Sequence, residues 1–268
     1  MVNYSVFVSS SDSYIDIWPV FFDLFKKYWP EFSGTIYLNT EEKTYRDNNL
    51  NIVCTQIGKQ KSFGSAFRKG LDCIPHEDVL LIMIDYIFMD NVNNSKLKEY
   101  YDFFKSENLD CFRLISYNFK NIEPTGNPEI NIILPPAPAV FFSYQIAIWK
   151  KSMLKKMVLP FENPWSSEIF GSKRAEIMGI KMASISKEDF NPIPYHPAGC
   201  IHRKKWHPEA IEFLNKIDYK IDFNIRGKYH SSDTENAVWK NKKAKIWNGI
   251  RGSWLDIFLK RVRYSFLK

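Results

Sequence analysis

The chain lacks the long apolar segment that a membrane-spanning helix requires. No apolar run in its 268 residues approaches the roughly 20 residues that cross a bilayer. Its first residues also lack a basic stretch that is followed by an apolar stretch and a small-residue cleavage site, so we expect no secretion signal. These absences predict a cytoplasmic protein that is either soluble or bound to the inner face of the cell membrane.

Cysteine and histidine patterns that bind metals are also missing. The four cysteines, at positions 54, 73, 111 and 200, form no Cys-x-x-Cys pair, which favours buried free thiols. The five histidines form neither a His-x-x-x-His nor a His-Glu-x-x-His pattern, so we expect no zinc site.

Net positive charge is confined to the C-terminal segment. The net charge is +7, but residues 240–268 hold nine Lys or Arg and one Asp, which leaves −1 for residues 1–239. A basic tail does not indicate a nucleic-acid-binding body, and we expect no nucleic-acid partner. Apolar side chains alternate with the basic ones after Trp254, which predicts an amphipathic helix that docks on an anionic membrane surface. The alternative is a helix packed on the core.

The most informative feature that is present is an apolar run at residues 79–84 that stops at Asp85. A continuous apolar run without alternation is typical of a strand buried on both faces, between layers of helices. In open α/β sheets, ligands bind at the carboxyl ends of such strands. The run therefore predicts both a fold class and a position for a site.

The rest of the chain alternates between predicted strands and helices. Strands are predicted at 4–8, 35–38, 51–54, 79–84 and 111–115, and helices at 15–29, 63–73 and 95–106. Asp12 or Ser13 is the expected N-cap of the first helix, and Asn94 that of the third. This order predicts an α/β fold with a mainly parallel sheet flanked by helices. We expect one domain over residues 1–239, followed by the basic segment 240–268.

The second half of the chain is richer in loops. Five prolines between residues 118 and 139 argue against a helix or a central strand there, so we expect a long structured loop. Helices are predicted at 151–157 and 164–179, the latter with Asn163 as N-cap and Pro164 in its first turn. Residues 186–208 are predicted to form another loop region.

Three acidic or hydroxyl positions could carry chemistry. The turn at residues 9–12 suits a nucleotide, although a plain helix cap is the alternative. Asp85 could ligate a divalent cation or a sugar hydroxyl, or it could be a solvated turn carboxylate. Glu168 lies in the first turns of a predicted helix and could accept a proton from an alcohol, although acids are common at such positions.

Two tryptophans are candidates for a sugar platform. A flat aromatic face such as that of Trp149 or Trp165 can support a sugar ring. The alternative for both is a place in the hydrophobic core.

Four segments carry a family resemblance: residues 63–71, 79–90, 143–149 and 162–172. Together with the Ser/Asp turn after the first strand, they resemble bacterial GT-A-type glycosyltransferases of surface-polysaccharide assembly, as in lipopolysaccharide, capsule and O-antigen. The resemblance covers roughly residues 3–205. Its most specific part is Gln145-x-x-x-Trp149, followed by Glu-Asn-Pro-Trp-x-x-Glu ending at Glu168.

The resemblance implies a GT-A-like, Rossmann-like fold and a sugar transfer from a nucleotide-sugar, with a UDP-sugar favoured, to a hydroxyl of a lipid-linked glycan. The donor would occupy the half at about 1–117 and the acceptor the half at about 118–239. The implied donor-binding residues are Ser9, Ser10, Asp12, Ser65, Arg68, Asp85 and Tyr86. The implied acceptor-binding residues are Gln145, Trp149, Trp165, His196 and His202. Glu168 would be the general base of an inverting reaction.

The acidic motif departs from the pattern of that family. Ile87 stands two residues after Asp85, so there is no Asp-x-Asp pair. Either Asp85 alone contributes to a Mn²⁺ or Mg²⁺ site, or the enzyme is metal-independent and offsets the diphosphate charge with cations. The candidates for that role are Arg68, His202, Arg203 and Lys204.

Two other functions stay open on the sequence. A sugar nucleotidyltransferase would also use an α/β sheet and an acidic strand end, but it would carry a Gly-rich phosphate loop, and residues 9–13 contain no glycine. A non-catalytic nucleotide- or glycan-binding module is compatible with the incomplete acidic motif.

Overall fold

The computed structural model describes residues 4–116, 121–134 and 141–230. The described residues divide into two compact units, the first of which ends at Gly199 and the second of which begins at Cys200. The strands of the first unit are β1 (Ser5–Ser9), β2 (Thr35–Leu38), β3 (Asn51–Cys54), β4 (Asp78–Met83), β5 (Cys111–Arg113), β6 (Ile122–Pro124), β7 (Ile130–Ile133), β8 (Ala147–Lys150) and β9 (Met182–Ile185). Its α-helices are α1 (Trp18–Tyr28), α2 (Phe63–Asp72), α3 (Asn94–Ser106), α4 (Lys151–Met157) and α5 (Pro164–Ile177). Short 3₁₀ turns are η1 (Asp12–Tyr14) and η2 (Glu188–Phe190).

The nine described strands of the first unit form one sheet in the order β3-β2-β1-β4-β8-β5-β9-β7-β6. β1, β2, β3 and β4 run parallel to one another, and β5 runs parallel to β9. β8 runs antiparallel to both β4 and β5, and β7 antiparallel to both β9 and β6. Only β8 and β7 of these described strands therefore oppose the common direction, and the predicted α/β fold with a mostly parallel sheet is confirmed.

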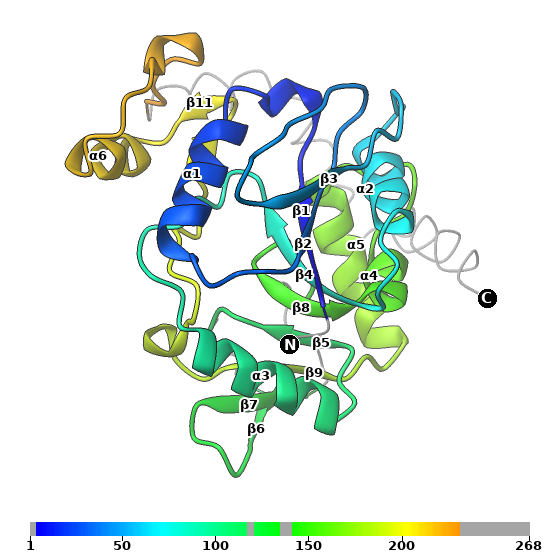
Figure 1. Ribbon diagram of the computed structural model, residues 1–268. Coiled ribbons are helices and arrows are strands. Elements are labelled where there is room, and N and C mark those ends of the chain that lie inside the picture. Colours follow the sequence, from blue (N-terminus) through cyan, green and yellow to red (C-terminus); the bar gives the residue numbers. More distant parts are fainter. Residues whose placement is uncertain (1–3, 117–120, 135–140, 231–268) are drawn as a thin grey trace. The chain divides into compact units, whose positions relative to one another are not determined.

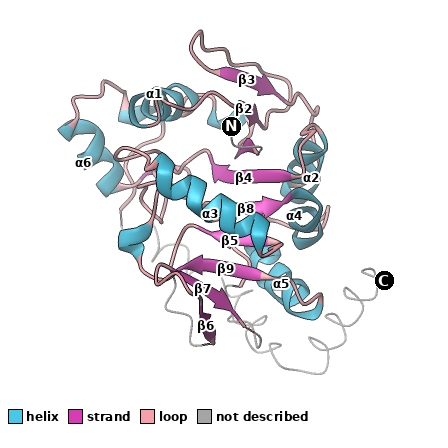
Figure 2. Cartoon of the chain, turned by 60° about the horizontal axis from the view of Figure 1, so that its bottom comes forward, coloured by secondary structure: helices cyan, strands magenta, loops and turns pink. Residues whose placement is uncertain are grey.

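Helices cover both faces of this sheet (Figures 1 and 2). α2, α4 and α5 pack on one face, over a core that includes Phe67, Trp149 and Met157. α1 and α3 lie on the other face, where Phe21, Phe25 and further rings pack together. The central strand β4 is almost fully buried, because helices cover it from both sides. This burial is the physical origin of the apolar run in the sequence.

The predicted loop at 118–139 is wrong for two segments. Residues 122–124 form β6 and residues 130–133 form β7. Pro124 is tolerated because β6 is an edge strand with exposed residues. No described strand lies on its outer side, so no hydrogen bond to such a strand is lost when the N–H is missing. β7 itself contains no proline, and the proline count of the whole segment hid its Ile-Asn-Ile-Ile pattern.

Two helix caps also differ from the predictions. α1 begins at Trp18, after η1, and its N-cap Ile17 makes no side-chain cap, so neither Asp12 nor Ser13 caps this helix. The side chain that caps α3 is Asn93, which accepts the Lys96 N–H at 3.1 Å, and not Asn94. Asn163 and Pro164 start α5 as predicted, with a reciprocal bond between the Asn163 and Ser166 positions.

The second unit is described up to residue 230. It contains the short antiparallel pair β10 (Ile201–His202) and β11 (Lys205–Trp206), then α6 (Pro208–Lys216) and η3 (Phe223–Ile225). Trp206 is buried and its ring lies 5.4 Å from that of Phe223. The predicted amphipathic helix and its segment 240–268 lie outside the described residues.

The cysteines are all free, but only half of them are buried. Cys111 and Cys200 are buried, Cys54 is half-buried and Cys73 is exposed. The prediction of buried thiols is therefore wrong for Cys73, which follows the last turn of α2. Within the described residues, no helix combines the length and apolar character needed to span a bilayer.

Candidate active site

The ends of β1 and β4 define the edge of the sheet at which the candidate site lies. These strands are parallel and adjacent, and the Ile84 N–H extends their pairing by donating to the Ser9 carbonyl at 3.0 Å. Ser10 and Asp85 therefore leave the sheet side by side at its carboxyl edge. This is the edge at which ligands bind in open α/β sheets.

Asp85 is a partly buried carboxyl group with an unusual neighbour. Burial raises the pKa of Asp85 to about 7. Gly199 lies directly against it, because a Cβ added at residue 199 would come within 2.5 Å of Oδ2 of Asp85. The positive φ of 75° at Gly199 is a second reason for glycine at this position. An ionised Asp85 would thus be poorly solvated unless a bound cation or donor group compensates its charge.

The loop that carries Gly199 is tied to the strand ends by hydrogen bonds. The Tyr195 hydroxyl donates to Oε1 of Gln145 at 2.8 Å, and Nε2 of Gln145 donates to the Pro197 carbonyl at 3.0 Å. The rings of Tyr86 and Tyr195 lie 4.9 Å apart. The structure therefore brings the predicted residues Asp85, Tyr86 and Gln145 together, with Tyr195 between them.

Glu168 reaches the same edge from α5. Its Oε1 accepts the Tyr144 N–H at 3.1 Å. Ala147 pairs with Leu81 in antiparallel register, so residue 144 lies beyond Met83, near the end of β4 where Asp85 follows. Burial raises the pKa of Glu168, although the Tyr144 N–H and the positive charge of Arg113 oppose that shift. The two acids singled out from the sequence thus lie at the same edge of the sheet.

Arg113 and Glu188 belong to this edge but were not predicted. Arg113 is 2% exposed, at the end of β5, and donates to the Ser143 hydroxyl at 2.6 Å. Its charge opposes the burial that raises the pKa of both Glu168 and Glu188. The available signal was an arginine inside the apolar segment 111–115, since an arginine is rarely fully buried unless it is paired.

The serine turn after β1 is largely occupied by the protein itself. Burial opposes the ionisation of Asp12, but the N–H groups of Glu42, Glu41 and Lys43 outweigh it and lower the pKa of Asp12. Ser9 is buried, and the Ser10 hydroxyl accepts from the Trp18 indole at 2.8 Å. Asp12 thus joins the loops that follow β1 and β2, and its role in donor binding stays a prediction.

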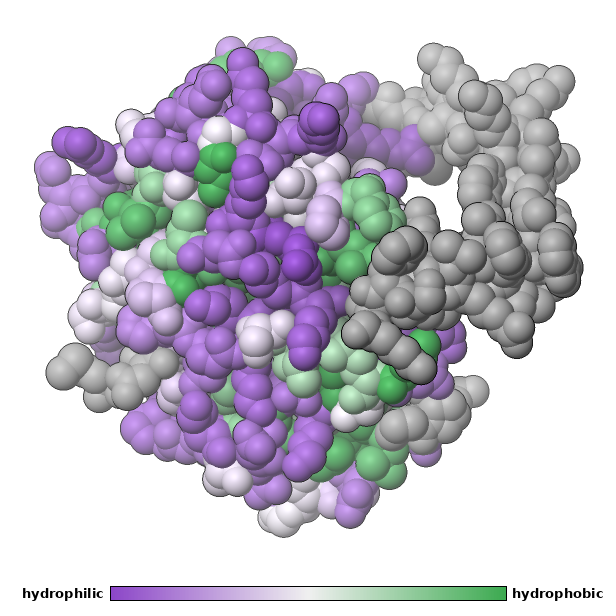
Figure 3. Space-filling model, turned by 90° about the vertical axis from the view of Figure 1, so that its right-hand side faces the viewer, coloured by the Kyte–Doolittle hydropathy of each residue, from purple (hydrophilic) through white to green (hydrophobic). Residues whose placement is uncertain are grey.

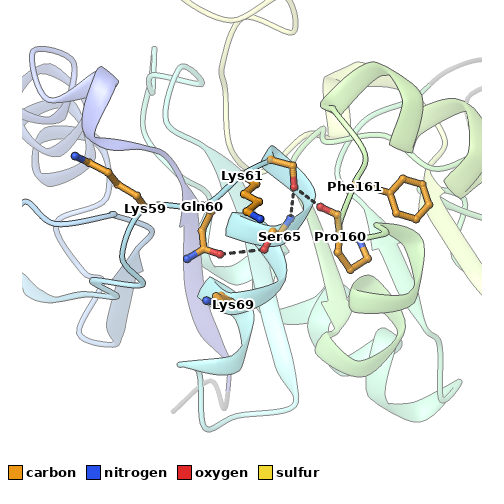
Figure 4. Close-up of a pocket in the computed structure, with 8 residues that line it drawn as sticks. Lys59, Gln60, Lys61, Ser65, Lys69, Pro160 and Phe161 are labelled. Atoms are coloured by element: carbon orange, nitrogen blue, oxygen red, sulfur yellow. Dashed lines mark hydrogen bonds between the residues drawn. The ribbon is translucent and has the colours of Figure 1, made fainter.

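Ser65 and Arg68 lie on α2, and their hydrogen-bond partners are residues other than Asp85. Arg68 donates to the carbonyls of Lys155 and Val158, so its guanidinium holds the end of α4. The Ser65 hydroxyl donates to Oε1 of Gln60 at 3.0 Å and lines a cavity at the start of α2 (Figure 4). This cavity has a volume of about 600 Å³, and three of its lining side chains are lysines.

The predicted aromatic and histidine positions separate into different environments. Trp149 is 1% exposed and packs on Phe142, so it is a core side chain and the expectation of a sugar platform is corrected for this residue. Trp165 is 75% exposed in the first turn of α5, one turn before Glu168. His196 is half-buried and accepts the Ala198 N–H at 3.3 Å, whereas His202 belongs to the second unit, where its ring lies 4.5 Å from that of Tyr229. The acceptor roles of Trp165, His196 and His202 stay predictions.

The fold and the site thus define an α/β protein with two partly buried carboxyl groups at the carboxyl edge of its sheet. No family model matches the sequence, and no curated protein matches it. Solved structures do show partial similarity of fold to this chain.

Staphylococcus aureus TarS 1–349 in complex with UDP-GlcNAc is 16% identical, with a TM-score of 0.47 over 80% of this chain and 65% of that one. A UDP-glucose pyrophosphorylase complexed with UDP-glucose is 11% identical, with a TM-score of 0.48 over 82% of this chain and 100% of that one. Glucosyl-3-phosphoglycerate synthase from Mycobacterium tuberculosis is 12% identical, with a TM-score of 0.40 over 66% of each chain. In another TarS 1–349 structure the matched part spans 58% of the TarS chain. At such identities the likeness concerns the fold alone.

Proposed function

We propose that this protein is a glycosyltransferase that moves a sugar from a nucleotide-sugar, with a UDP-sugar favoured, to a hydroxyl group of a lipid-linked glycan. The observation that supports this proposal most directly is the position of Asp85 and Glu168 at the same edge of the sheet, each with a raised pKa. Perturbed carboxyl groups at a ligand-binding edge are typical of catalytic acids and bases. The sequence resemblance to surface-polysaccharide glycosyltransferases supplies the reaction class.

In this proposal Glu168 is the general base. A glutamate with a raised pKa is a stronger base than an ordinary one, and it removes the acceptor proton as the acceptor oxygen attacks the anomeric carbon. The Tyr144 N–H fixes one carboxylate oxygen, which leaves the other for the acceptor hydroxyl. One base on the face opposite the leaving diphosphate gives inversion of configuration.

Asp85 is the proposed contact for the donor. Its carboxylate would bind either a Mn²⁺ or Mg²⁺ ion on the diphosphate or a hydroxyl of the sugar. Ion binding would also relieve the cost of an ionised Asp85 beside Gly199. Peripheral membrane attachment through the segment 240–268 would bring the enzyme to a lipid-linked acceptor.

Donor binding is tested by thermal unfolding with nucleoside diphosphates, UDP first, with and without Mn²⁺ or Mg²⁺. A ligand at 100 times its dissociation constant stabilises the native state by about 2.7 kcal/mol, which raises the melting temperature by a few degrees. A shift that needs the cation, and that Asp85→Asn abolishes, would place the cation at Asp85. If no diphosphate changes the melting temperature, the donor proposal is wrong.

Catalysis is tested by donor turnover in Glu168→Gln, with Glu176→Gln as the matched control. Glu176 lies on the same helix and pairs with Lys173, so its loss tests α5 without touching the site. We expect a loss of about 10²-fold or more in kcat for Glu168→Gln and no change for the control. We also expect the acid limb of the kcat/KM profile to lie above pH 4.5, because the base works only when ionised and its pKa is raised. Wild-type turnover in Glu168→Gln would refute its role as base.

A further inference from the structure

The cavity at the start of α2 carries a group of positive charges. Lys59, Lys61 and Lys69 line it together with the hydroxyls of Ser62 and Ser65. All three lysines are exposed. Figure 4 shows Lys59 and Phe161 at opposite ends of this cavity, with the other labelled side chains between them.

Exposed apolar side chains continue the same surface along α5. Phe161 is 58% exposed, Trp165 75% and Ile169 48%. Trp165 and Ile169 are four residues apart on the helix, so they lie on one face of it. Groups of large exposed apolar side chains are costly in water and mark interaction surfaces. We call these three residues and the three lysines the α2–α5 surface.

Two of the three acids near this surface pair with residues outside it. Glu162 is 1% exposed and pairs with Arg174 at 2.6 Å. Asp72 pairs with Lys155, and Glu42 lies 3.8 Å from Lys59 as a loose, exposed contact. The α2–α5 surface therefore combines apolar side chains with an excess of positive charge. Figure 3, which views the side that carries α2, α4 and α5, shows hydrophilic and hydrophobic groups intermixed there.

The backbone under this surface is fixed in place. The Gly64 N–H donates to the Glu162 carbonyl at 2.9 Å, and the Ser62 hydroxyl donates to the Pro160 carbonyl. These bonds join the start of α2 to the loop before α5. The lysines and the aromatic rings are therefore presented together on one rigid frame, and little conformational entropy is lost when they dock.

We propose that the α2–α5 surface docks on the headgroup region of an anionic phospholipid bilayer. The lysines face the lipid phosphates, and Phe161 and Trp165 enter the boundary between headgroups and acyl chains. Lysines around a Trp and a Phe are the side-chain chemistry of interfacial membrane binding. The charge complementarity favours an anionic leaflet over an apolar protein partner. The residues of this proposed contact are different from those of the basic segment 240–268.

Vesicle flotation of the full-length protein tests the proposal. The vesicles are phosphatidylcholine alone, or phosphatidylcholine with phosphatidylglycerol. We expect Phe161→Ser/Trp165→Ser to lower partitioning onto the anionic vesicles by about tenfold, since two interfacial aromatics are lost. Ile177→Ser is the matched control, because Ile177 is 62% exposed at the far end of α5. It should change partitioning less than about twofold, and thermal unfolding should show that both variants are folded.

A second measurement separates this surface from the basic segment. Phosphatidylglycerol with brominated acyl chains quenches tryptophans that enter the bilayer, and the difference between wild type and Trp165→Phe reports Trp165 alone. We expect the loss of a quenched component in Trp165→Phe, and a several-fold weaker binding in Lys59→Gln/Lys61→Gln/Lys69→Gln. Equal quenching of wild type and Trp165→Phe would overturn the proposal, as would equal flotation of the double serine variant. If the triple glutamine variant binds the vesicles as well as wild type does, the lysines do not contribute to binding. The surface would then bind through its apolar side chains alone, which contradicts the proposal.

Discussion

At the scale of single residues, the environment of Asp85 matters more than its identity. An aspartate at a strand end is ordinary, but this one lies against the Gly199 backbone, and its pKa is about 7. Protonated Asp85 is tolerated in the folded chain, whereas ionised Asp85 is penalised by its surroundings. The site therefore holds a carboxyl group that changes charge near neutral pH when no ligand is bound.

The raised pKa of Asp85 predicts that the stability of the protein depends on pH. The folded-state pKa of about 7 lies above the ordinary aspartate pKa of 3.8, so the unfolded chain releases the Asp85 proton first as the pH rises. The stability that protonated Asp85 contributes to the folded state is fully present below pH 4. It is lost as the pH rises from 4 to 7. Removal of the charge by Asp85→Asn should therefore raise the free energy of unfolding by about 2 kcal/mol at pH 8, after allowance for partial solvation, and by little at pH 4.

Urea unfolding of wild type and Asp85→Asn at both pH values measures this difference. Asp90→Asn is a suitable control, because Asp90 is exposed on the same loop. If the stability gained by Asp85→Asn does not depend on pH, the carboxyl group titrates near its ordinary pKa and the argument for a perturbed site fails.

At the scale of elements, the approach of α2 to the loop before α5 fixes the frame of the α2–α5 surface. Gly64 makes this approach possible, because a Cβ at residue 64 would lie 2.0 Å from the Leu159 carbonyl oxygen. Arg174 supports the same loop from α5, since it pairs with the buried Glu162 and donates to the Met157 carbonyl. Backbone atoms cannot yield in the way that flexible side chains do.

Gly64→Ala should consequently destabilise the protein, although alanine is the better helix former. We expect a loss of about 2–4 kcal/mol in the free energy of unfolding, as for overpacking against backbone. Gly126→Ala is the matched control, because nothing lies within 4 Å of a Cβ at residue 126. Denaturant melts of both variants give the comparison, and a Gly64→Ala protein as stable as wild type would show that α2 can move away from the loop.

At the scale of the whole molecule, the sequence predicted the sheet through its buried centre. The apolar run before Asp85 required helices on both faces, and the structure has them. The edge strand β6 was predicted as a loop because of Pro124. A proline excludes a strand only where the strand forms hydrogen bonds with neighbours on both sides. Local pattern does not distinguish an edge strand from a loop.

The candidate site could be predicted in part for a similar reason. Asp85 and Glu168 stand at the end of a strand and the start of a helix, which are positions that sequence marks. Arg113 and Glu188 come to the site through the pairing of β5 with β8 and β9, which no local spacing reveals. Trp149 and Trp165 were equivalent in the sequence, and only the packing of β8 under the helices separates the core ring from the exposed one.

The division into two units predicts that residues 1–199 fold by themselves. This part holds the whole described nine-stranded sheet and α1 to α5, with hydrophobic cores on both faces. We expect a fragment of residues 1–199 to unfold in one cooperative thermal transition with retained near-ultraviolet circular dichroism, within a few degrees of a fragment of residues 1–239. A broad, non-cooperative melt of the shorter fragment beside a sharp melt of the longer one would contradict this. In that case residues 200–239 complete the fold, and the domain extends to residue 239, as expected from the sequence.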